Sequence, residues 1–339
     1  MLIGLVYGGQ GAEEFTNLQA TKDIERVLLH YSLKIQRIYL NNPKFKQRDI
    51  EKINLFLIID SNSKNRSNRE ILFNRIKSHK IDYISQKQSA LLLARNKFKS
   101  NNIFKRHGLN IPNAFLFSSA HGLFKKELNK KLEDFITNNG FPLVLKDNFG
   151  SSSENLRICF SQKEFLDFLS YLSKICSKVL IERYIPGVEV TVPRVMFFGK
   201  AYVLNPIQIN YRGYLYDYKI KNKTFQDKLK IPPSLPQKTL QEIKTVTIKA
   251  NNLIGSSYYS RVDMKIDGNT IYILEVNGEP VLSKNDFISR SLKSIGVSYP
   301  KFVFGLLSNS ELFTNYLKHK NKEAYKFMIR AKDKILAIN

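Results

Sequence analysis

The sequence is poor in several residue types, and each shortage excludes a class of protein. It has two cysteines, Cys159 and Cys176, and five histidines, with no spacing typical of a structural zinc site. Two cysteines are also too few for the disulfide framework of a small secreted domain. No apolar run approaches the length of a transmembrane helix, and the start MLIGLVYGG lacks the basic segment and cleavage site of a signal peptide. We therefore expect a cytoplasmic protein without structural zinc.

Acidic residues are scarce relative to basic ones, with 29 Asp and Glu against 54 Lys and Arg and a net charge of +25. Such an excess is typical of proteins that neutralise nucleic-acid phosphates. The basic residues are spread along the whole chain, however, and no nucleic-acid-binding motif accompanies them, so we do not expect a nucleic-acid partner. A positive field also attracts a smaller polyanion such as ATP. With 339 residues and 43% hydrophobic content, the chain can form more than one domain.

Alternating strand and helix patterns predict an α/β protein that opens with a parallel sheet. One apolar run spans residues 2–7 and leads through two glycines into a helix pattern, and a second spans residues 53–59. We predict a small parallel-sheet domain over residues 1 to about 90. A single helix is then expected over residues 90–107, because Gly108 follows as a stop signal.

Later segments alternate in the same way. Residues 141–160 predict two strands joined by a Gly-Ser-rich turn. Further expected elements are helices at 163–177 and 239–253 and strands at 179–192, 190–212 and 258–277. The last segment, 314–339, is a Lys-rich helix pattern that is either a partner surface or a solvated basic helix, and we favour the second interpretation.

Two polar residues end one of these strands, in the stretch ILEVNGEP at residues 273–280. With a period of two, Ile271, Ile273, Glu275 and Asn277 share one face of the strand. A carboxylate and a carboxamide therefore point the same way at the end of an apolar run.

The preceding stretch, RVDMKIDGN, places Arg261, Asp263 and Lys265 on one face by the same alternation. A two-residue turn at Asp267-Gly268 would put Asp263 and Glu275 on opposite faces of the hairpin. A three-residue loop instead pairs Asp263 with Ile273 and makes it a diagonal neighbour of Glu275. We predict the three-residue loop.

That register gathers Arg261, Asp263, Glu275 and Asn277 into one cluster. Carboxylate and carboxamide oxygens suit Mg²⁺, which completes its octahedron with water and phosphate oxygens. The alternative is a solvated hairpin face with an ordinary cross-strand ion pair. The apolar run before Glu275 favours an interior site.

The hairpin is one of several motifs that together resemble the ATP-grasp superfamily, and the D-alanine-D-alanine ligases in particular. The motifs are VDM and ILEVN in the hairpin, IERYIPGVEVTV and GSSS before it, and the LNPI, YDY and Lys stretch at 204–221. The resemblance covers residues 1–313. It implies an N-terminal α/β domain (1–90), a central ATP-grasp lobe (91–180) and a C-terminal ATP-grasp lobe (181–313), with the helix at 314–339 outside it.

The resemblance also implies roles for the polar residues. Asp263, Glu275 and Asn277 would bind two Mg²⁺ ions, with Mn²⁺ as a substitute, and Arg261 would face the transferred phosphoryl group. The residues that match the ATP site of the family are Lys97 and Lys146 at the phosphates, Ser152 in the GSSS loop, Glu182 with the backbone of Arg183 to Ile185 at the adenine, and Glu189 at the ribose.

Five further residues stand at positions of the family's amino-acid site: Glu13, Ser151 and Lys221 match it, whereas Val281 replaces a glycine and Asp286 a serine. Glu13 and Ser151 would position the ammonium group of the first amino acid, and Lys221 would lie near the carboxylate of the second. The backbone N–H of Val281 would stabilise the oxyanion. Asp286 stands where the family usually has a serine, which disfavours a second carboxylate substrate in that place.

Other departures also concern the amino-acid site. The His-Gly stretch of the family is replaced by IIDSNSKNRSN at residues 58–68, and Asn222 replaces a tyrosine. The GSSS loop is one residue shorter and has Glu154 in place of a glycine.

The predicted function is therefore an ATP-dependent ligase that forms D-alanyl-D-alanine through an acyl phosphate, for peptidoglycan precursor synthesis. Its expected partners are ATP and amino acids, with no membrane, and the expected assembly is a homodimer. Two alternatives are a ligase that joins an amino acid to a different amine and a nucleotide-binding relative without ligase activity.

Overall fold

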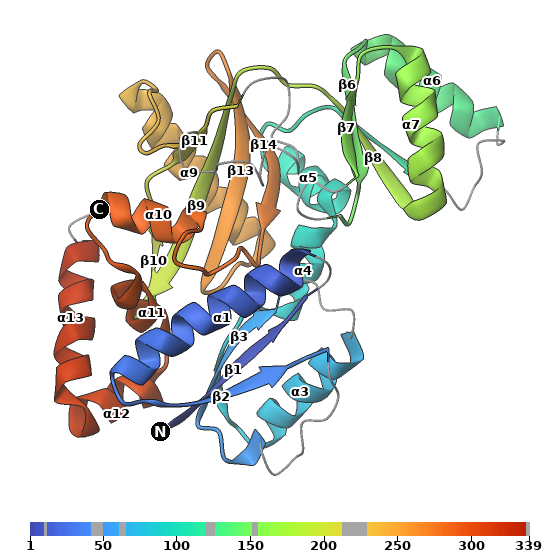
Figure 1. Cartoon of the computed structure of the whole chain (residues 1–339). Helices are drawn as coiled ribbons and strands as arrows, with labels where there is room; N and C mark the ends of the chain where they lie inside the picture. Colours follow the sequence, from blue (N-terminus) through green and yellow to red (C-terminus); the bar gives the residue numbers. More distant parts are fainter. Residues whose placement is uncertain are drawn as a thin grey trace.

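A computed structural model describes most of the chain, and Figure 1 shows how its elements are arranged. No helix within this described part is long and apolar enough to cross a membrane. The described residues are 1–9, 12–41, 50–60, 66–118, 126–150, 155–211 and 229–336.

The N-terminal part is a parallel sheet with the strand order β2-β1-β3-β4. Its central strands are buried on both faces, with Ile3 and Leu5 of β1 in one apolar cluster and Val6 in another. This two-sided burial is typical of parallel sheets, and it confirms the parallel sheet predicted from the apolar runs. The elements are β1 (Leu2–Gly8), α1 (Ala12–His30), β2 (Lys34–Tyr39), β3 (Leu55–Asp60), α3 (Arg66–Ser78) and β4 (Asp82–Ile84).

The single helix predicted for residues 90–107 is wrong. The chain forms two helices, α4 (Gln88–Arg95) and α5 (Lys97–Arg106), which are separated by Asn96. The Asn96 side chain accepts a hydrogen bond from the backbone N–H of Lys99 at 3.1 Å and so caps α5. The break places Lys97 at the first turn of a helix.

The second sheet is antiparallel, with the order β5-β8-β6-β7. Two helices, α6 and α7, lie beside it (Figure 1), and α7 buries Phe165, Leu169 and Leu172. Burial in this core raises the pKa of the Cys159 and Cys176 thiols to about 11. The elements are β5 (Ala114–Ser118), α6 (Lys126–Asn139), β6 (Leu143–Asp147), β7 (Leu156–Cys159), α7 (Gln162–Ile175) and β8 (Lys178–Arg183).

The third sheet is antiparallel and has the order β12-β11-β9-β13-β14, with β10 paired to β9. One face is apolar and packs on α9, α4 and α5. The opposite face holds the polar side chains described below. The elements are β9 (Val188–Phe197), β10 (Lys200–Val203), β11 (Ile207–Ile209), β12 (Leu229–Lys230), α9 (Gln237–Ile254), β13 (Tyr259–Asp267) and β14 (Thr270–Asn277).

The three-residue hairpin loop predicted between β13 and β14 is wrong. Asp267 pairs with Thr270, so the loop is the two residues Gly268 and Asn269. A β-bulge then shifts the register by one residue, because Met264 pairs with Ile273 whereas Asp263 pairs with Glu275. Asp263 and Glu275 are therefore direct cross-strand neighbours instead of diagonal ones.

The bulge also corrects the predicted alternation along β14. Ile271, Ile273 and Val276 all belong to the apolar cluster beneath the sheet. Leu274 is the extra residue, so Glu275 and Asn277 lie on the face opposite Ile271 and Ile273. The prediction that these two polar residues share one face is confirmed, and the prediction that they share it with the two isoleucines is wrong.

The solvated basic helix predicted for residues 314–339 is also wrong. Two helices occupy this segment within the described residues, α12 (Glu311–Lys320) and α13 (Lys322–Leu336), with Asn321 between them. Leu317 and Met328 are fully buried in the apolar cluster that also covers one face of the N-terminal sheet. Most lysines of the segment are exposed, and α13 packs against α12 and against α11 (Tyr299–Leu307), which in turn contacts α10 (Phe287–Ser294) (Figure 1).

Met328 provides a test of this packing. Met328→Ala should lower the free energy of unfolding by about 2–5 kcal/mol, because it leaves a cavity in a closed core. Lys326→Ala on the exposed side of the same helix should change it by less than about 0.5 kcal/mol. Urea unfolding followed by circular dichroism measures both, and equal stabilities of the two variants would contradict the buried placement of α13.

Candidate functional site

The polar face of the third sheet is formed by alternate residues of three neighbouring strands. Val190 and Val192 of β9 and Val262 and Met264 of β13 point into the apolar cluster. Their neighbours along each strand therefore point to the other face. These neighbours are Glu189 and Thr191 on β9, Arg261, Asp263 and Lys265 on β13, and Glu275 and Asn277 on β14.

Arg261 and Asp263 form a bidentate ion pair on this face. Arg261 Nε donates to Asp263 Oδ1 and Arg261 Nη2 to Asp263 Oδ2, both at 2.9 Å. Burial by itself lowers the pKa of Arg261, but Asp263, Asp286 and Glu275 outweigh it and raise that pKa, so the guanidinium stays charged. Thr191 Oγ1 adds a hydrogen bond to Asp263 Oδ1 at 2.5 Å.

Lys97 joins this cluster from the start of α5. Its Nζ lies 3.2 Å from Glu275 Oε2 and also donates to the backbone oxygen of Gly150. Gly150 directly precedes the segment that contains Ser151, so one lysine links the third sheet to the chain after β6. The position of Lys97 depends on the helix break at Asn96.

A second buried ion pair lies in the second sheet. Lys146 Nζ on β6 is 2.7 Å from Glu182 Oε2 on β8, and Asn101 Nδ2 on α5 donates to Glu182 Oε1 at 3.3 Å. Arg183 ends β8, and Ile185 follows it as a buried residue. The structure thus brings the predicted phosphate lysine and the predicted adenine-side carboxylate into direct contact.

Glu189 has two partners that sequence reasoning missed. Tyr211 Oη donates to Glu189 Oε2 at 2.7 Å, and Lys265 Nζ lies 3.7 Å from the same oxygen. Burial lowers the pKa of Lys265, opposed by Glu189, and burial together with Glu189 raises the pKa of Tyr211. Strand alternation predicts Lys265 on the same face as Asp263, and the structure confirms it; the contact of Lys265 with Glu189 had no signal in the sequence.

The predicted amino-acid site is described only in part. Glu13 lies in the first turn of α1, after the carboxyl end of β1. Val281 lies in the segment after β14, and Asp286 caps α10 by accepting the backbone N–H of Phe287 at 2.7 Å. Ser151, Ser152 and Lys221, like Asn222 and Glu154, lie outside the described residues.

The donor set on the polar face fits a divalent cation that prefers oxygen ligands. Asp263 and Glu275 supply carboxylates and Asn277 a carboxamide from neighbouring strands. Within the described part of the chain, no group of three His, Cys, Asp or Glu side chains is placed to hold a metal ion. Asp263 and Glu275 provide two carboxylates, and Mg²⁺ is often bound through one or two carboxylates together with substrate phosphates.

Comparison with known proteins identifies the family of this chain. The sequence profile described as the D-ala D-ala ligase C-terminus matches residues 103–308, more than half of the chain. The chain belongs to the D-alanine-D-alanine ligase family, as its motifs predicted.

Individual relatives agree with this assignment. The D-alanine-D-alanine ligase of Fervidobacterium nodosum is 26% identical over 313 residues, covering 89% of this chain and 96% of the relative. That of Bacillus anthracis is 25% identical over 316 residues, covering 91% and 97%.

Solved structures confirm the predicted α/β ATP-grasp fold. The Bacillus anthracis ligase complexed with ATP superposes with a TM-score of 0.72 at 22% identity, covering 91% of this chain and 97% of that one. The VanG D-Ala:D-Ser ligase of Enterococcus faecalis gives a TM-score of 0.73 at 16% identity, covering 91% and 98%.

The turn between β8 and β9 offers a test of the site geometry. Gly187 has a φ of +92°, and a Cβ there would lie 2.1 Å from the backbone oxygen of Ile266 on β13. Gly187→Ala should therefore lower the free energy of unfolding by about 2–4 kcal/mol, since strain and a backbone clash add. Gly199→Ala, at a φ of +75° with open space around it, should cost only about 1–2 kcal/mol. Thermal unfolding of both variants checks the difference, and equal losses would show that the close approach of β13 is not a constraint.

Proposed function

We propose that this chain is an ATP-dependent ligase that joins two D-alanine molecules into D-alanyl-D-alanine for peptidoglycan precursor synthesis. The observation that supports it best is the convergence of Arg261, Asp263, Glu275, Asn277 and Lys97 on one polar face, in a chain of this family. Positive and negative groups at close range are what phosphoryl transfer requires from a protein, because the reaction develops charge on phosphate oxygens.

In the first step, a carboxylate oxygen of the first amino acid attacks the γ-phosphorus of ATP. The bond between that phosphorus and the bridging oxygen breaks, which gives an acyl phosphate and ADP. Lys97 and Lys146 bind phosphate oxygens, and Arg261 faces the transferred group and balances its charge. Glu182 and the backbone of Arg183 to Ile185 hold the adenine, and Glu189 holds the ribose. Ser152 completes the nucleotide site.

A bound divalent cation would supply electrostatic stabilisation of the phosphate charge. Asp263, Glu275 and Asn277 would hold it, and we propose two Mg²⁺ ions, replaceable by Mn²⁺. The family uses ATP with a divalent metal in general, and the oxygen donors of this chain fit that chemistry.

In the second step, the amine of the second amino acid attacks the acyl carbon, and phosphate leaves from the tetrahedral intermediate. Glu13 and Ser151 orient the ammonium group of the first amino acid, and Lys221 binds the carboxylate of the second. Arg261 and the backbone N–H of Val281 stabilise the oxyanion. Arg261 lies within electrostatic range of Asp286 and offsets part of its negative charge, so a second carboxylate substrate is less strongly repelled than Asp286 alone would predict.

We further propose that the enzyme is cytoplasmic, where its co-substrate ATP is made, and that it forms a homodimer. Size-exclusion chromatography with light scattering measures the second property directly.

The proposed activity predicts that phosphate is released from ATP in the presence of D-alanine and Mg²⁺, with one D-alanyl-D-alanine formed for each phosphate. Coupled phosphate detection and mass spectrometry of the products measure both quantities. Phosphate release only with a second, different amine would assign the enzyme to another acceptor. ATP binding without any amino-acid-dependent turnover would overturn the ligase proposal.

The metal assignment predicts that Glu275→Ala lowers turnover by more than about 100-fold, because it removes an oxygen ligand and the partner of Lys97. Glu242→Ala, on the exposed side of α9, serves as a matched control and should keep wild-type turnover. Wild-type turnover in Glu275→Ala would show that Glu275 does not hold the metal.

A further inference from the structure

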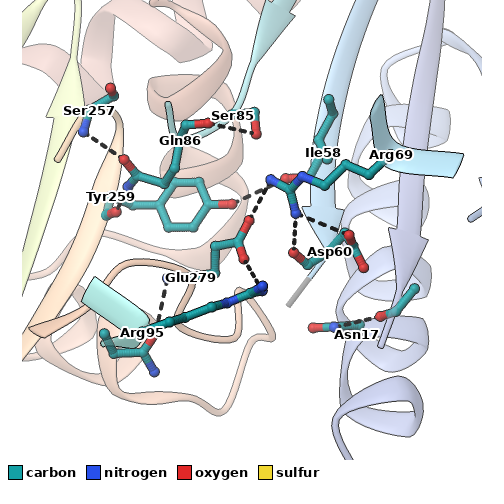
Figure 2. Close-up of polar contacts among 12 residues, drawn as sticks. Asn17, Ile58, Asp60, Arg69, Ser85, Gln86, Arg95, Ser257, Tyr259 and Glu279 are labelled. Carbon is teal, nitrogen blue, oxygen red and sulfur yellow. Dashed lines mark hydrogen bonds and ion pairs between the residues drawn. The ribbon is translucent and has the colours of Figure 1, made fainter. Parts of the chain in front are cut away.

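A buried cluster of four charges lies outside the site described above, at the end of β14 (Figure 2). Glu279 accepts from Arg69 Nη2 of α3 at 2.8 Å through one carboxylate oxygen and from Arg95 Nη2 of α4 at 3.1 Å through the other. Arg69 Nη1 also donates to Asp60 Oδ2 at the end of β3, at 3.0 Å. Two carboxylates and two guanidinium groups therefore neutralise each other where the N-terminal sheet meets the third sheet.

The cluster is closed to solvent except at one end. The side chains of Asp60, Arg69 and Glu279 are at most 7% exposed, whereas that of Arg95 is 25% exposed. Burial lowers the pKa of Arg69, but Glu279 and Asp60 outweigh it and raise that pKa, so the Arg69 guanidinium stays charged. The geometry of Glu279 is thus fixed from two sides by strong, charge-assisted hydrogen bonds.

Other hydrogen bonds also connect the N-terminal part of the chain to the third sheet beside the cluster. Tyr259 Oη of β13 donates to the backbone oxygen of Ile58 on β3 at 3.1 Å. Gln86 Nε2 donates to the backbone oxygen of Tyr259, and its Oε1 accepts the backbone N–H of Ser257 at 2.6 Å. Figure 2 shows these hydrogen bonds next to Glu279.

A hydrogen bond connects this cluster to the proposed metal site. The backbone N–H of Glu279 donates to Asn277 Oδ1 at 2.9 Å. A carboxamide oxygen has two lone pairs, so one can accept this N–H while the other remains for a cation. Without the hydrogen bond, the Asn277 amide is free to rotate and present its NH₂ group, which repels a cation.

We propose that Glu279, held by Arg69 and Arg95, is a positioning residue that fixes the Asn277 carboxamide and thereby sets the divalent-cation affinity of the site. This inference rests on the proposed function, in which Asn277 is a metal ligand. It also gives a role to the two sequence departures at 58–68 and after Asn277, since Asp60, Arg69 and Glu279 belong to these segments or follow them directly. Partners that orient metal ligands commonly control metal affinity by 10–100-fold.

The test measures Mn²⁺ binding to the ADP complex by electron paramagnetic resonance of the free ion, which does not depend on turnover. Glu279→Gln keeps the shape of the side chain but removes its charge, and it should raise the Kd for Mn²⁺ about tenfold. Arg95→Met removes only the partly exposed partner and should raise it about threefold, while the affinity for ADP without metal stays unchanged in both variants.

The control variant is Glu25→Gln, which breaks the Arg37–Glu25 ion pair, 3.3 Å long and away from the site. Its Kd for Mn²⁺ should equal that of the wild type. If Glu279→Gln fails to fold, Arg95→Met decides the matter. Wild-type Mn²⁺ affinity in the folded variants would overturn the positioning role of Glu279, whereas a wild-type chain that binds no Mn²⁺ with ADP would overturn the proposed metal site itself.

Discussion

The one-residue bulge at Leu274 is the constraint on which the site depends. Ile271 and Ile273 must be buried beneath the sheet, and so must Val276, yet these residues do not fit a strict period of two. The extra residue reverses the alternation, so the apolar side chains stay in the core while Glu275 and Asn277 turn to the polar face. The bulge also brings Asp263 and Glu275 directly opposite each other.

Charge balance explains how so many ionised groups coexist on that face. On that face Arg261 pairs with Asp263 and Lys97 with Glu275, and in the second sheet Lys146 pairs with the buried Glu182. An unpaired charge in such surroundings would be strongly destabilising. The same lysines and arginine are the groups that the proposed reaction uses to bind phosphate, so the site is stable in itself and complementary to an anionic substrate.

The N-terminal sheet and the C-terminal helices form one apolar core with the end of the third sheet. Residues as distant as Leu5, Phe197 and Met328 belong to the same cluster. The buried charges around Glu279 lie at the other contact between these parts (Figure 2). Together these contacts fix the first turn of α1, where Glu13 lies, relative to the strands that carry Asp263, Glu275 and Asn277.

The sequence by itself determined the family, the α/β class, the parallel sheet at the N-terminus and the polar residues of the hairpin. These features depend on local motifs and on apolar periodicity, which are written in consecutive residues. The tertiary structure alone decided the hairpin register, the helix break at Asn96 and the burial of α13. The bulge and the buried helix face depend on how distant segments pack against the same core, and the break at Asn96 is also held by a hydrogen bond from Asn148, 52 positions away. The partnership of Glu279 with Arg69 across 210 positions has no signal in the local sequence.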